Sequence, residues 1–370
     1  MNPPILVTAK ITENRMASFF LPGPVDVSPE VLAAQARPLL PPSSPEFQSL
    51  CQRIQDKLKR LFFGSQDVFI FPGGQETMRE AAVRNLVNER MLVCCAGSSS
   101  SRWVEIGRAN DRQVDVLEVS MGEAVDPQRL ADFLAGQAYE AVAITHTEIS
   151  TGVTHPVTAL SEAVHRANPE TLLMLDVSAS LGGVELPLED WGADFTLSCG
   201  ERCLALPPGL GLGAATPRAL ERASRIKNRG CAFDFVQYQR KAAREGTPPI
   251  NPIPLLFSLD VQLDRIHLEG MPNRAARHAA LAGRVREWAA SRDLPVLAEP
   301  HCRADTLTVV QNRRGISIDD LNQFLLLRGM RLANGMGPLK DKYFCISNMG
   351  EIQPADLEAL LNAVDMFIGN

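Results

Sequence analysis

V-F-I-F-P-G-G-Q, residues 68–75, joins a short apolar strand to a helix through two glycines. Residues 68–71 predict the strand because they form a short apolar run, and a helical pattern starts at Gln75, directly after Gly73 and Gly74. A strand that passes at once into a helix is the repeating unit of α/β proteins. We therefore expect the rest of the chain to repeat this unit.

The alternation continues on the carboxyl side of this unit. Further strands are predicted in short apolar runs separated by helical or loop segments: residues 91–95, 114–119, 141–145 and 172–176. On the amino side, Ser44 and Pro45 are a cap and a first-turn residue that start a helix. Its apolar residues recur at helical spacing: Phe47, Leu50, Ile54, Leu58 and Leu61. Together these elements predict a mainly parallel sheet with helices on both faces.

The pattern changes after Pro252-Ile253-Pro254. Helical spacing dominates residues 255–291, and the segments that follow read as two strands and two helices: residues 306–310, 343–346, 317–327 and 354–367. We therefore expect three parts, namely an amino-terminal arm (residues 1–20), a large α/β domain (residues 21–254) and a smaller α+β carboxy-terminal domain (residues 255–370).

Composition and charge argue against several function classes. With 45% hydrophobic and 22% charged residues the chain is in the ordinary globular range, and a net charge of -6 offers no broad attraction to nucleic acid or anionic lipid. No apolar stretch reaches the roughly 20 residues of a membrane span. The amino terminus lacks a signal-peptide pattern, and eight cysteines in a chain of this length do not form a small disulfide framework. A cytoplasmic location is expected.

Five segments that occur in order resemble class V aminotransferases, specifically the serine–pyruvate and alanine–glyoxylate group. They are LPGPVDVSPEVL (residues 21–32), THTEISTGV (residues 145–153), DVSASLGG (residues 176–183), LPPGLG (residues 206–211) and GMGPLKDKYFCISNMG (residues 335–350). The resemblance covers nearly the whole chain. It implies fold type I, a pyridoxal-phosphate ancestry, and a homodimer with active sites at the subunit interface. The arm around residues 21–27 is then expected to pack near the partner subunit.

The resemblance puts Arg202 at the position of the family's Schiff-base lysine. That lysine lies five residues before the Pro-Pro-Gly turn, and counting back from Pro207 reaches Arg202, which Glu201 and Cys203 flank. A guanidinium stays protonated in proteins, so it cannot act as the amine nucleophile. We therefore expect no covalently bound pyridoxal phosphate, although non-covalent pyridoxal or pyridoxamine phosphate stays possible. Rescue by another lysine is the alternative, with Lys340 as the first candidate.

Other cofactor positions implied by the resemblance are also changed. The family's Ser-Gly-Thr phosphate cradle reads Gly73-Gly74-Gln75 here, its ring-stacking aromatic matches Ser99, and its neutral glutamine beside the lysine matches Glu201. A carboxylate about 4 Å from a phosphate costs roughly 4 kcal/mol per pair of unit charges at an effective dielectric of 20. Asp176, in contrast, matches the family carboxylate that faces the pyridine nitrogen.

Substrate and partner positions complete the set. Cys345 matches the arginine that clamps the substrate carboxylate, and a thiol cannot replace that fork. Thr151 lies in a segment that borders the family's substrate pocket, and Pro249 and Ile250 align roughly with its partner-subunit phosphate contacts. His146 is expected near the pocket.

Several side chains carry both a functional and a structural interpretation. His146 and Cys203 are candidates for proton transfer or nucleophilic chemistry, but a lone histidine or free cysteine is more often structural. A functional Cys203 or Cys199 would need a pKa lowered by the neighbouring Arg202. The cysteine spacing matches no zinc motif, so no metal site is predicted. Arg202 itself could bind an anionic ligand or pair locally with Glu201.

Three hypotheses about function follow. The first is an enzyme that has repurposed the old pocket, acts on a small anionic metabolite, and uses either no cofactor or a loosely held one. The second is a non-catalytic pseudoenzyme that binds a ligand or regulates a partner. The third is ordinary transamination rescued by another lysine.

Overall fold

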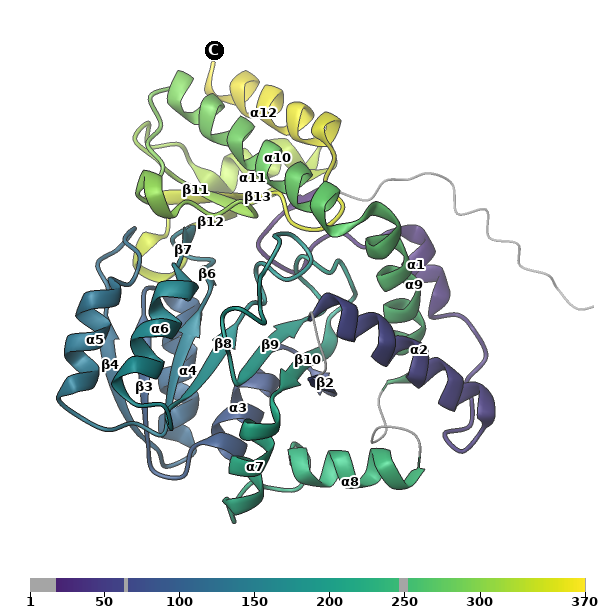
Figure 1. Cartoon of the computed structure of the whole chain (residues 1–370). Coiled ribbons are helices and arrows are strands. Elements are labelled where there is room, and N and C mark those ends of the chain that lie inside the picture. The colour runs from purple at the N-terminus through teal and green to yellow at the C-terminus, as the bar shows by residue number, and fades with distance from the viewer. Residues whose placement is uncertain (1–17, 63–65, 246–251, 370) are drawn as a thin grey trace, which may run out of the picture.

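The computed structural model describes residues 18–62, 66–245 and 252–369. Two separate sheets organise this part of the chain (Figure 1). The larger sheet has seven strands in the order β2-β10-β9-β8-β5-β3-β4, and the smaller sheet has four in the order β1-β12-β13-β11. A two-stranded ribbon, β6 (Thr147–Glu148) with β7 (Val153–Thr154), stands beside the larger sheet.

The large sheet is mainly parallel, as predicted. Its strands are β2 (Asp67–Gly73), β3 (Arg90–Cys95), β4 (Gln113–Glu118), β5 (Ala141–Thr145), β8 (Leu172–Asp176), β9 (Phe195–Cys199) and β10 (Gly209–Ala215). Only β10 runs antiparallel to its neighbours β2 and β9. The five strands predicted from the sequence are confirmed within one or two residues.

β9 and β10 were not predicted. β10 is glycine-rich, which ordinarily weakens a strand. A β-carbon at Gly211 would lie 2.6 Å from Met78 Cγ, and one at Gly213 would lie 2.5 Å from Met78 Cε. The glycines are therefore needed so that Met78 can pack flat on this strand.

Helices cover both faces of the large sheet, which confirms the predicted fold class. One face carries α3 (Gln75–Leu86), α4 (Ser98–Ala109), α7 (Pro217–Arg225) and α8 (Phe235–Glu245). The other carries α1 (Pro29–Ala34), α2 (Pro45–Leu61), α5 (Pro127–Ala135), α6 (Val157–Ala167) and α9 (Ile253–Glu269). The Ser44 side chain caps α2 by accepting from Phe47 N at 3.2 Å, and all five predicted apolar positions of that helix are buried.

The small sheet belongs to a separate core. Its strands are β1 (Ser18–Phe20), β11 (Leu307–Gln311), β12 (Met330–Asn334) and β13 (Tyr343–Ser347), and its helices are α10 (Met271–Ser291), α11 (Ile318–Leu326) and α12 (Pro354–Ile368). Two short 3-10 turns, η1 (Pro300–Cys302) and η2 (Gly337–Leu339), connect them.

The long helical stretch predicted for residues 255–291 is two helices, α9 and α10, separated at Gly270. Gly270 has φ of 78°, a conformation that glycine adopts without strain. The apolar residues of α9 pack into the core of the large sheet rather than the small one. The chain therefore passes from the core of the large sheet to that of the small sheet near Gly270, after the boundary expected at residue 254.

A buried arginine joins the two cores. Arg274, on α10, is 1% exposed and donates to the carboxylates of Glu269 and Glu351 at 2.7 and 3.0 Å. It also donates to the backbone carbonyls of Gly182 at 2.6 Å and Cys203 at 3.0 Å, both in turns of the large domain. A small-domain helix thus fixes the turn that follows β9.

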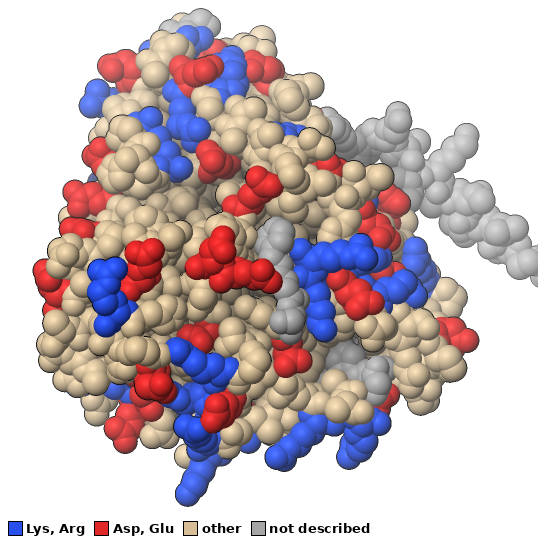
Figure 2. Space-filling view, in the orientation of Figure 1, with Lys and Arg blue, Asp and Glu red and all other residues tan. Residues whose placement is uncertain are grey.

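Figure 2 shows acidic and basic side chains interspersed over the visible face of the molecule. No helix among the described residues combines the length and the apolarity needed to cross a membrane.

Candidate functional site

The carboxyl ends of β5, β8 and β9 bring together most of the residues singled out in the sequence. α/β sheets bind ligands at this edge, because the strand-to-helix turns there present polar groups and helix amino termini. The amino termini of α3 and α4 and the turn at residues 200–206, after β9, meet the same edge. The segment before α1 also reaches it, since Val25 N donates to Glu201 O at 3.1 Å.

Asp176, the last residue of β8, is buried and already paired. Arg79 Nε donates to Asp176 Oδ2 at 3.0 Å, and Arg79 Nη2 donates to the same oxygen. The second oxygen, Oδ1, accepts from Ser178 N at 2.8 Å. The two side chains are 0% and 1% exposed, so this is an ion pair enclosed by protein.

Arg79 also reaches the start of α4. Its Nη2 donates to Ser99 Oγ at 2.8 Å, and its guanidinium lies 5.9 Å from the Trp103 ring centroid. The third nitrogen, Nη1, is buried and has no hydrogen-bond partner. Arg79 was missed in the sequence. The sequence offered little signal, since Arg79 is one of several charged residues in this helix, with Glu76, Glu80 and Arg84.

The serines at residues 98–101 form the first turn of α4 and bind a protein carboxylate. Glu148 is fully buried and accepts from Ser99 N and Ser100 N, both at 2.9 Å. It also accepts from the hydroxyls of Ser100 and Ser150 at 2.9 and 3.0 Å. A helix amino terminus favours an anion, and here Glu148 supplies it.

At the start of α3, the Glu201 carboxylate lies against the glycine turn. A β-carbon on Gly74 would lie 2.9 Å from Glu201 Oε1, so only a glycine leaves room for this approach. The other oxygen, Oε2, is buried without a partner. Burial raises the pKa of Glu201, and the nearby Arg202 only partly opposes this shift.

Arg202 points toward the segment before α1 and the start of α3. Its Nη1 donates to Pro22 O, and its Nε donates to Gln75 Oε1 at 3.2 Å. Only 7% of the residue is exposed. Among the described residues no carboxylate forms a salt bridge with this guanidinium, but Arg202 still offsets part of the rise that burial causes in the pKa of Glu201 and so acts on that carboxylate at longer range.

His146 is buried behind the site. Its backbone N donates to Asp176 O at 2.8 Å, and its Nδ1 lies 2.8 Å from Ser180 Oγ. Its ring packs 5.1 Å from that of Trp191. Burial, reinforced by the neighbouring His155, lowers the pKa of His146 to about 3.

The cysteines are enclosed among apolar residues. Cys203 and Cys345 belong to one buried cluster with Val25, Ala179 and neighbouring side chains, and Cys203 Sγ donates to Ala179 O at 3.2 Å. Burial raises the pKa of both thiols to about 12, despite the arginines near Cys203. Burial also raises the pKa of Cys199. The lowered thiol pKa considered from the sequence is therefore wrong.

Thr151 is buried at the end of the β6 turn, and its hydroxyl has no partner. Its neighbour Ser150 accepts from Ser98 N at 2.9 Å, which places this turn against the start of α4. Pro249 and Ile250 lie outside the described residues. No group of His, Cys, Asp and Glu among the described residues could hold a metal ion.

Among the described residues, no lysine places a buried amine at this edge of the sheet. Lys57 is paired with Asp260 and Asp264 at 2.6 and 2.8 Å. Lys340 is exposed after η2. Met336 of the same loop reaches the site, since its sulfur lies 3.5 Å from Ser98 Oγ.

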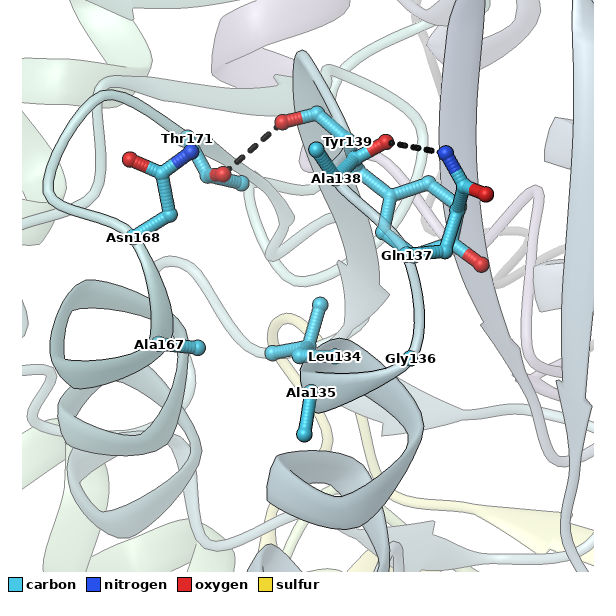
Figure 3. Close-up of a pocket in the computed structure, with 9 residues that line it drawn as sticks. All are labelled: Leu134, Ala135, Gly136, Gln137, Ala138, Tyr139, Ala167, Asn168 and Thr171. Carbon is cyan, nitrogen blue, oxygen red and sulfur yellow. Dashed lines mark hydrogen bonds between the residues drawn. The ribbon is translucent and has the colours of Figure 1, made fainter.

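A separate depression of about 320 Å³ lies between the ends of α5 and α6 (Figure 3). It is lined by residues that directly precede β5 and β8, among them Tyr139 and Thr171, joined by a hydrogen bond of 2.8 Å between Thr171 Oγ1 and Tyr139 O. These are the amino ends of parallel strands, so the depression lies at the edge opposite the candidate site.

Comparison with known proteins places the fold and site in a family. The chain is 29% identical to a serine–glyoxylate aminotransferase of Hyphomicrobium methylovorum over 358 residues, covering 94% of this chain and 88% of the relative. It is 27% identical to the soluble hydrogenase 42 kDa subunit of Anabaena cylindrica over 354 residues, covering 94% and 92%. The crystal structure of an alanine–glyoxylate aminotransferase from Nostoc sp. superposes with a TM-score of 0.90 at 25% identity, covering 100% of this chain and 99% of the other.

The profile of the family described as aminotransferase class-V matches residues 49–337, which is most of the chain. This match includes the Arg79–Asp176 pair and the turn that carries Arg202. The chain therefore belongs to the class V aminotransferases, on the fold-type-I scaffold of pyridoxal-phosphate enzymes.

Proposed function

We propose that this protein is a small-anion-binding member of the class V aminotransferases that no longer performs lysine-dependent transamination. The observation that carries the proposal is the environment of Arg202. Its permanent positive charge is almost fully buried, yet its hydrogen-bond partners, Pro22 O and Gln75 Oε1, are neutral. Buried charges are ordinarily paired, because an uncompensated one is costly. Glu201 acts on Arg202 only at longer range, and a carboxylate or phosphate of a ligand beside Arg202 would supply a direct counter-charge.

Orphaned polar atoms at the same edge support a ligand there. Most buried polar atoms in proteins have a hydrogen-bond partner. In the described part of the chain, four buried polar atoms near the site lack a hydrogen-bond partner. They lie on α3, on the β6 turn and on the turns after β8 and β9: Arg79 Nη1, Thr151 Oγ1, Ser178 Oγ and Glu201 Oε2. Both donors and acceptors are among them. A small polar ligand with its own water molecules would complete these bonds.

The residues present do not fit the family's cofactor. Arg202 cannot form an imine. Asp176 is a poor partner for a protonated pyridine nitrogen, since Arg79 neutralises its charge and occupies Oδ2 while Oδ1 already accepts from Ser178 N. The glycine turn at α3, where the family binds the phosphate, already faces the Glu201 carboxylate. The aldehyde, the ring nitrogen and the phosphate of the cofactor would therefore each meet an unsuitable partner.

The titratable candidates favour binding over catalysis. Proton transfer at neutral pH needs a group whose pKa lies near 7. Burial lowers the pKa of His146 to about 3 and raises that of Cys203 to about 12. Neither group is poised to exchange protons at neutral pH. We therefore favour the non-catalytic hypothesis over a cofactor-independent enzyme. Chemical conversion of an added small anion by the protein would favour the enzyme instead.

The names of relatives suggest the ligand class. Two of the proteins compared act on glyoxylate by name. We infer that the ligand is a small carboxylate of this type, such as a 2-oxo acid, with inorganic phosphate as the competing anion. The homodimer and the cytoplasmic location remain predictions. Sedimentation at micromolar concentration that shows only a monomer would contradict the homodimer.

Calorimetric titration with glyoxylate and with inorganic phosphate tests the proposal. The wild-type protein is expected to bind at least one of them, and Arg202→Gln is expected to weaken that binding at least tenfold, because it removes a charge-assisted hydrogen bond. Arg202→Lys keeps the charge but loses the planar fork, so an intermediate loss is expected. Arg222→Gln, on the surface helix α7, is the control and should leave binding unchanged.

Equal affinity of the wild-type protein and Arg202→Gln would contradict the proposal. So would the absence of binding to both probes. Release of a product from glyoxylate by the wild-type protein would instead establish a catalytic role in the same pocket.

A further inference from the structure

We propose that Arg79 is a second, independent determinant against pyridoxal phosphate, because it neutralises the carboxylate that would otherwise hold the ring nitrogen. The proposal does not depend on an anion at Arg202. It concerns the opposite end of the ancestral cofactor position, on α3 and β8. Its consequence is that a lysine restored at position 202 would not be sufficient for tight cofactor binding.

The geometry shows that Arg79 is held in place from both sides. Its Nε and Nη2 both bind Asp176 Oδ2, and Nη2 also binds Ser99 Oγ at 2.8 Å. Ser99 N in turn donates to Glu148 at 2.9 Å. The result is a continuous chain of polar contacts from β8 through α3 and α4 to β6. Ser99 is the position that the resemblance assigns to a stacking aromatic ring, which could not accept this hydrogen bond.

A pyridine nitrogen cannot displace Arg79 at low cost. The ion pair is enclosed, with both partners at most 1% exposed. If a protonated ring took Asp176, the Arg79 guanidinium would stay buried without a counter-charge, and such an orphaned charge is strongly destabilising. If Arg79 kept Asp176, the ring nitrogen could reach only Oδ1, which already accepts from Ser178 N and belongs to a carboxylate whose charge Arg79 neutralises. In both cases the contact that supports the ring as an electron sink is weakened.

The orphaned Nη1 of Arg79 sharpens this assignment. A buried arginine that served only the fold would be expected to have all its donors paired. Arg79 instead directs two nitrogens to Asp176 and leaves the third without a partner. The arrangement therefore gives both oxygens of Asp176 a donor and leaves one donor of Arg79 without an acceptor.

Pyridoxal phosphate itself is the probe for the test. Four proteins are titrated with it by absorbance, then reduced with borohydride and analysed by peptide mass: the wild type, Arg202→Lys, Arg79→Met, and the double variant Arg79→Met/Arg202→Lys. The double variant is expected to bind at least about tenfold more tightly than Arg202→Lys, since it frees Asp176 Oδ2 from both charge-assisted bonds of Arg79. It is also expected to carry the phosphopyridoxyl group at position 202.

Two further variants keep the test decisive. Arg79→Gln retains one hydrogen bond to Asp176 while removing the charge, and it replaces Arg79→Met if that variant does not fold. Arg84→Met, on the same helix but paired with Glu80 and Arg229 O, is the matched control and should not alter the affinity of Arg202→Lys. The proposal is overturned if Arg202→Lys alone binds as tightly as the double variant, or if the folded double variant gains no affinity.

Discussion

Two buried arginines, Arg274 and Arg79, serve different parts of this molecule. Arg274 joins the two cores, and each of its three nitrogens has a partner: two carboxylates and two backbone carbonyls in total. Arg79 stands at the candidate site with one carboxylate and one hydroxyl, and its Nη1 is orphaned. Both residues are almost inaccessible to solvent.

The difference separates a structural arginine from a site arginine. A fully paired guanidinium fixes two backbone segments and leaves no capacity for a ligand. Arg79 and Arg202 lack part of that pairing, and both lie at the carboxyl edge of the large sheet. Between these buried arginines, incomplete pairing rather than burial is therefore the property that differs.

Arg274→Met should have the largest effect on stability. Removal of a guanidinium from a buried ion pair costs about 3–5 kcal/mol, because its buried partners stay behind. We expect the upper part of that range because the carbonyls of Gly182 and Cys203 lose their donor as well, although Glu269 keeps Arg277 and Glu351 keeps Arg265. Urea unfolding measures the change, and Arg284→Met, in a half-exposed pair with Glu358, should cost less than about 1 kcal/mol. Equal effects would contradict the structural role of Arg274.

Arg79→Met should cost less than Arg274→Met, about 3 kcal/mol, because it leaves a single buried carboxylate without its cation. Arg79→Met/Asp176→Asn should recover most of this loss, since neither charge then remains. Urea unfolding of the three variants measures the recovery. A double variant as unstable as Arg79→Met alone would show that packing, rather than the ion pair, dominates at this position.

Buried neutral histidines should make the protein acid-sensitive. Burial lowers the pKa of His278 to about 3, with Arg274 and Arg277 contributing. Because the folded-state pKa lies below the unfolded value near 6.5, the contribution is complete above pH 6.5 and is lost as pH falls toward 3. At pH 5 the loss is about 2 kcal/mol for such a residue.

Unfolding free energies at pH 7 and pH 5 measure this dependence. His278→Gln should reduce the difference between the two values by about 2 kcal/mol, whereas the exposed His301→Gln should leave it unchanged. An unchanged difference in His278→Gln would mean that this histidine is protonated in the folded state.

Arg202→Lys should have the smallest effect on stability. Its guanidinium has only neutral partners, and a lysine can still donate to Pro22 O, so a change within about 1 kcal/mol is expected. Thermal or urea unfolding without ligand measures it. A loss as large as that of Arg274→Met would assign Arg202 to the fold rather than to a ligand.

The sequence allowed much of the fold to be predicted, because periodicity and capping are local. Ser44 caps its helix, and the strands at residues 141–145 and 172–176 have the predicted bounds. β10 was missed because its glycines are explained only by Met78 on another element. The position of α9 on the core of the large sheet is likewise a property of packing between distant segments.

The site could be located but not characterised from the sequence. The motif segments around Asp176 and Arg202 identified the right edge of the sheet. The partners of these residues could not be inferred, because Arg79 is 97 residues from Asp176 and Pro22 is 180 residues from Arg202. The thiol pKa values were misjudged for a related reason, since burial in the cluster around Cys203 outweighs the nearby positive charges.

Peptide mapping after borohydride reduction tests the central claim most directly. The protein is produced with excess pyridoxal phosphate, reduced, digested and analysed for phosphopyridoxyl groups on lysine. Arg202 cannot form an imine, and Asp176 is already paired with Arg79, so no lysine is expected to carry the group. A stoichiometric phosphopyridoxyl group on Lys340, or on any other lysine of the chain, would contradict the loss of lysine-dependent chemistry.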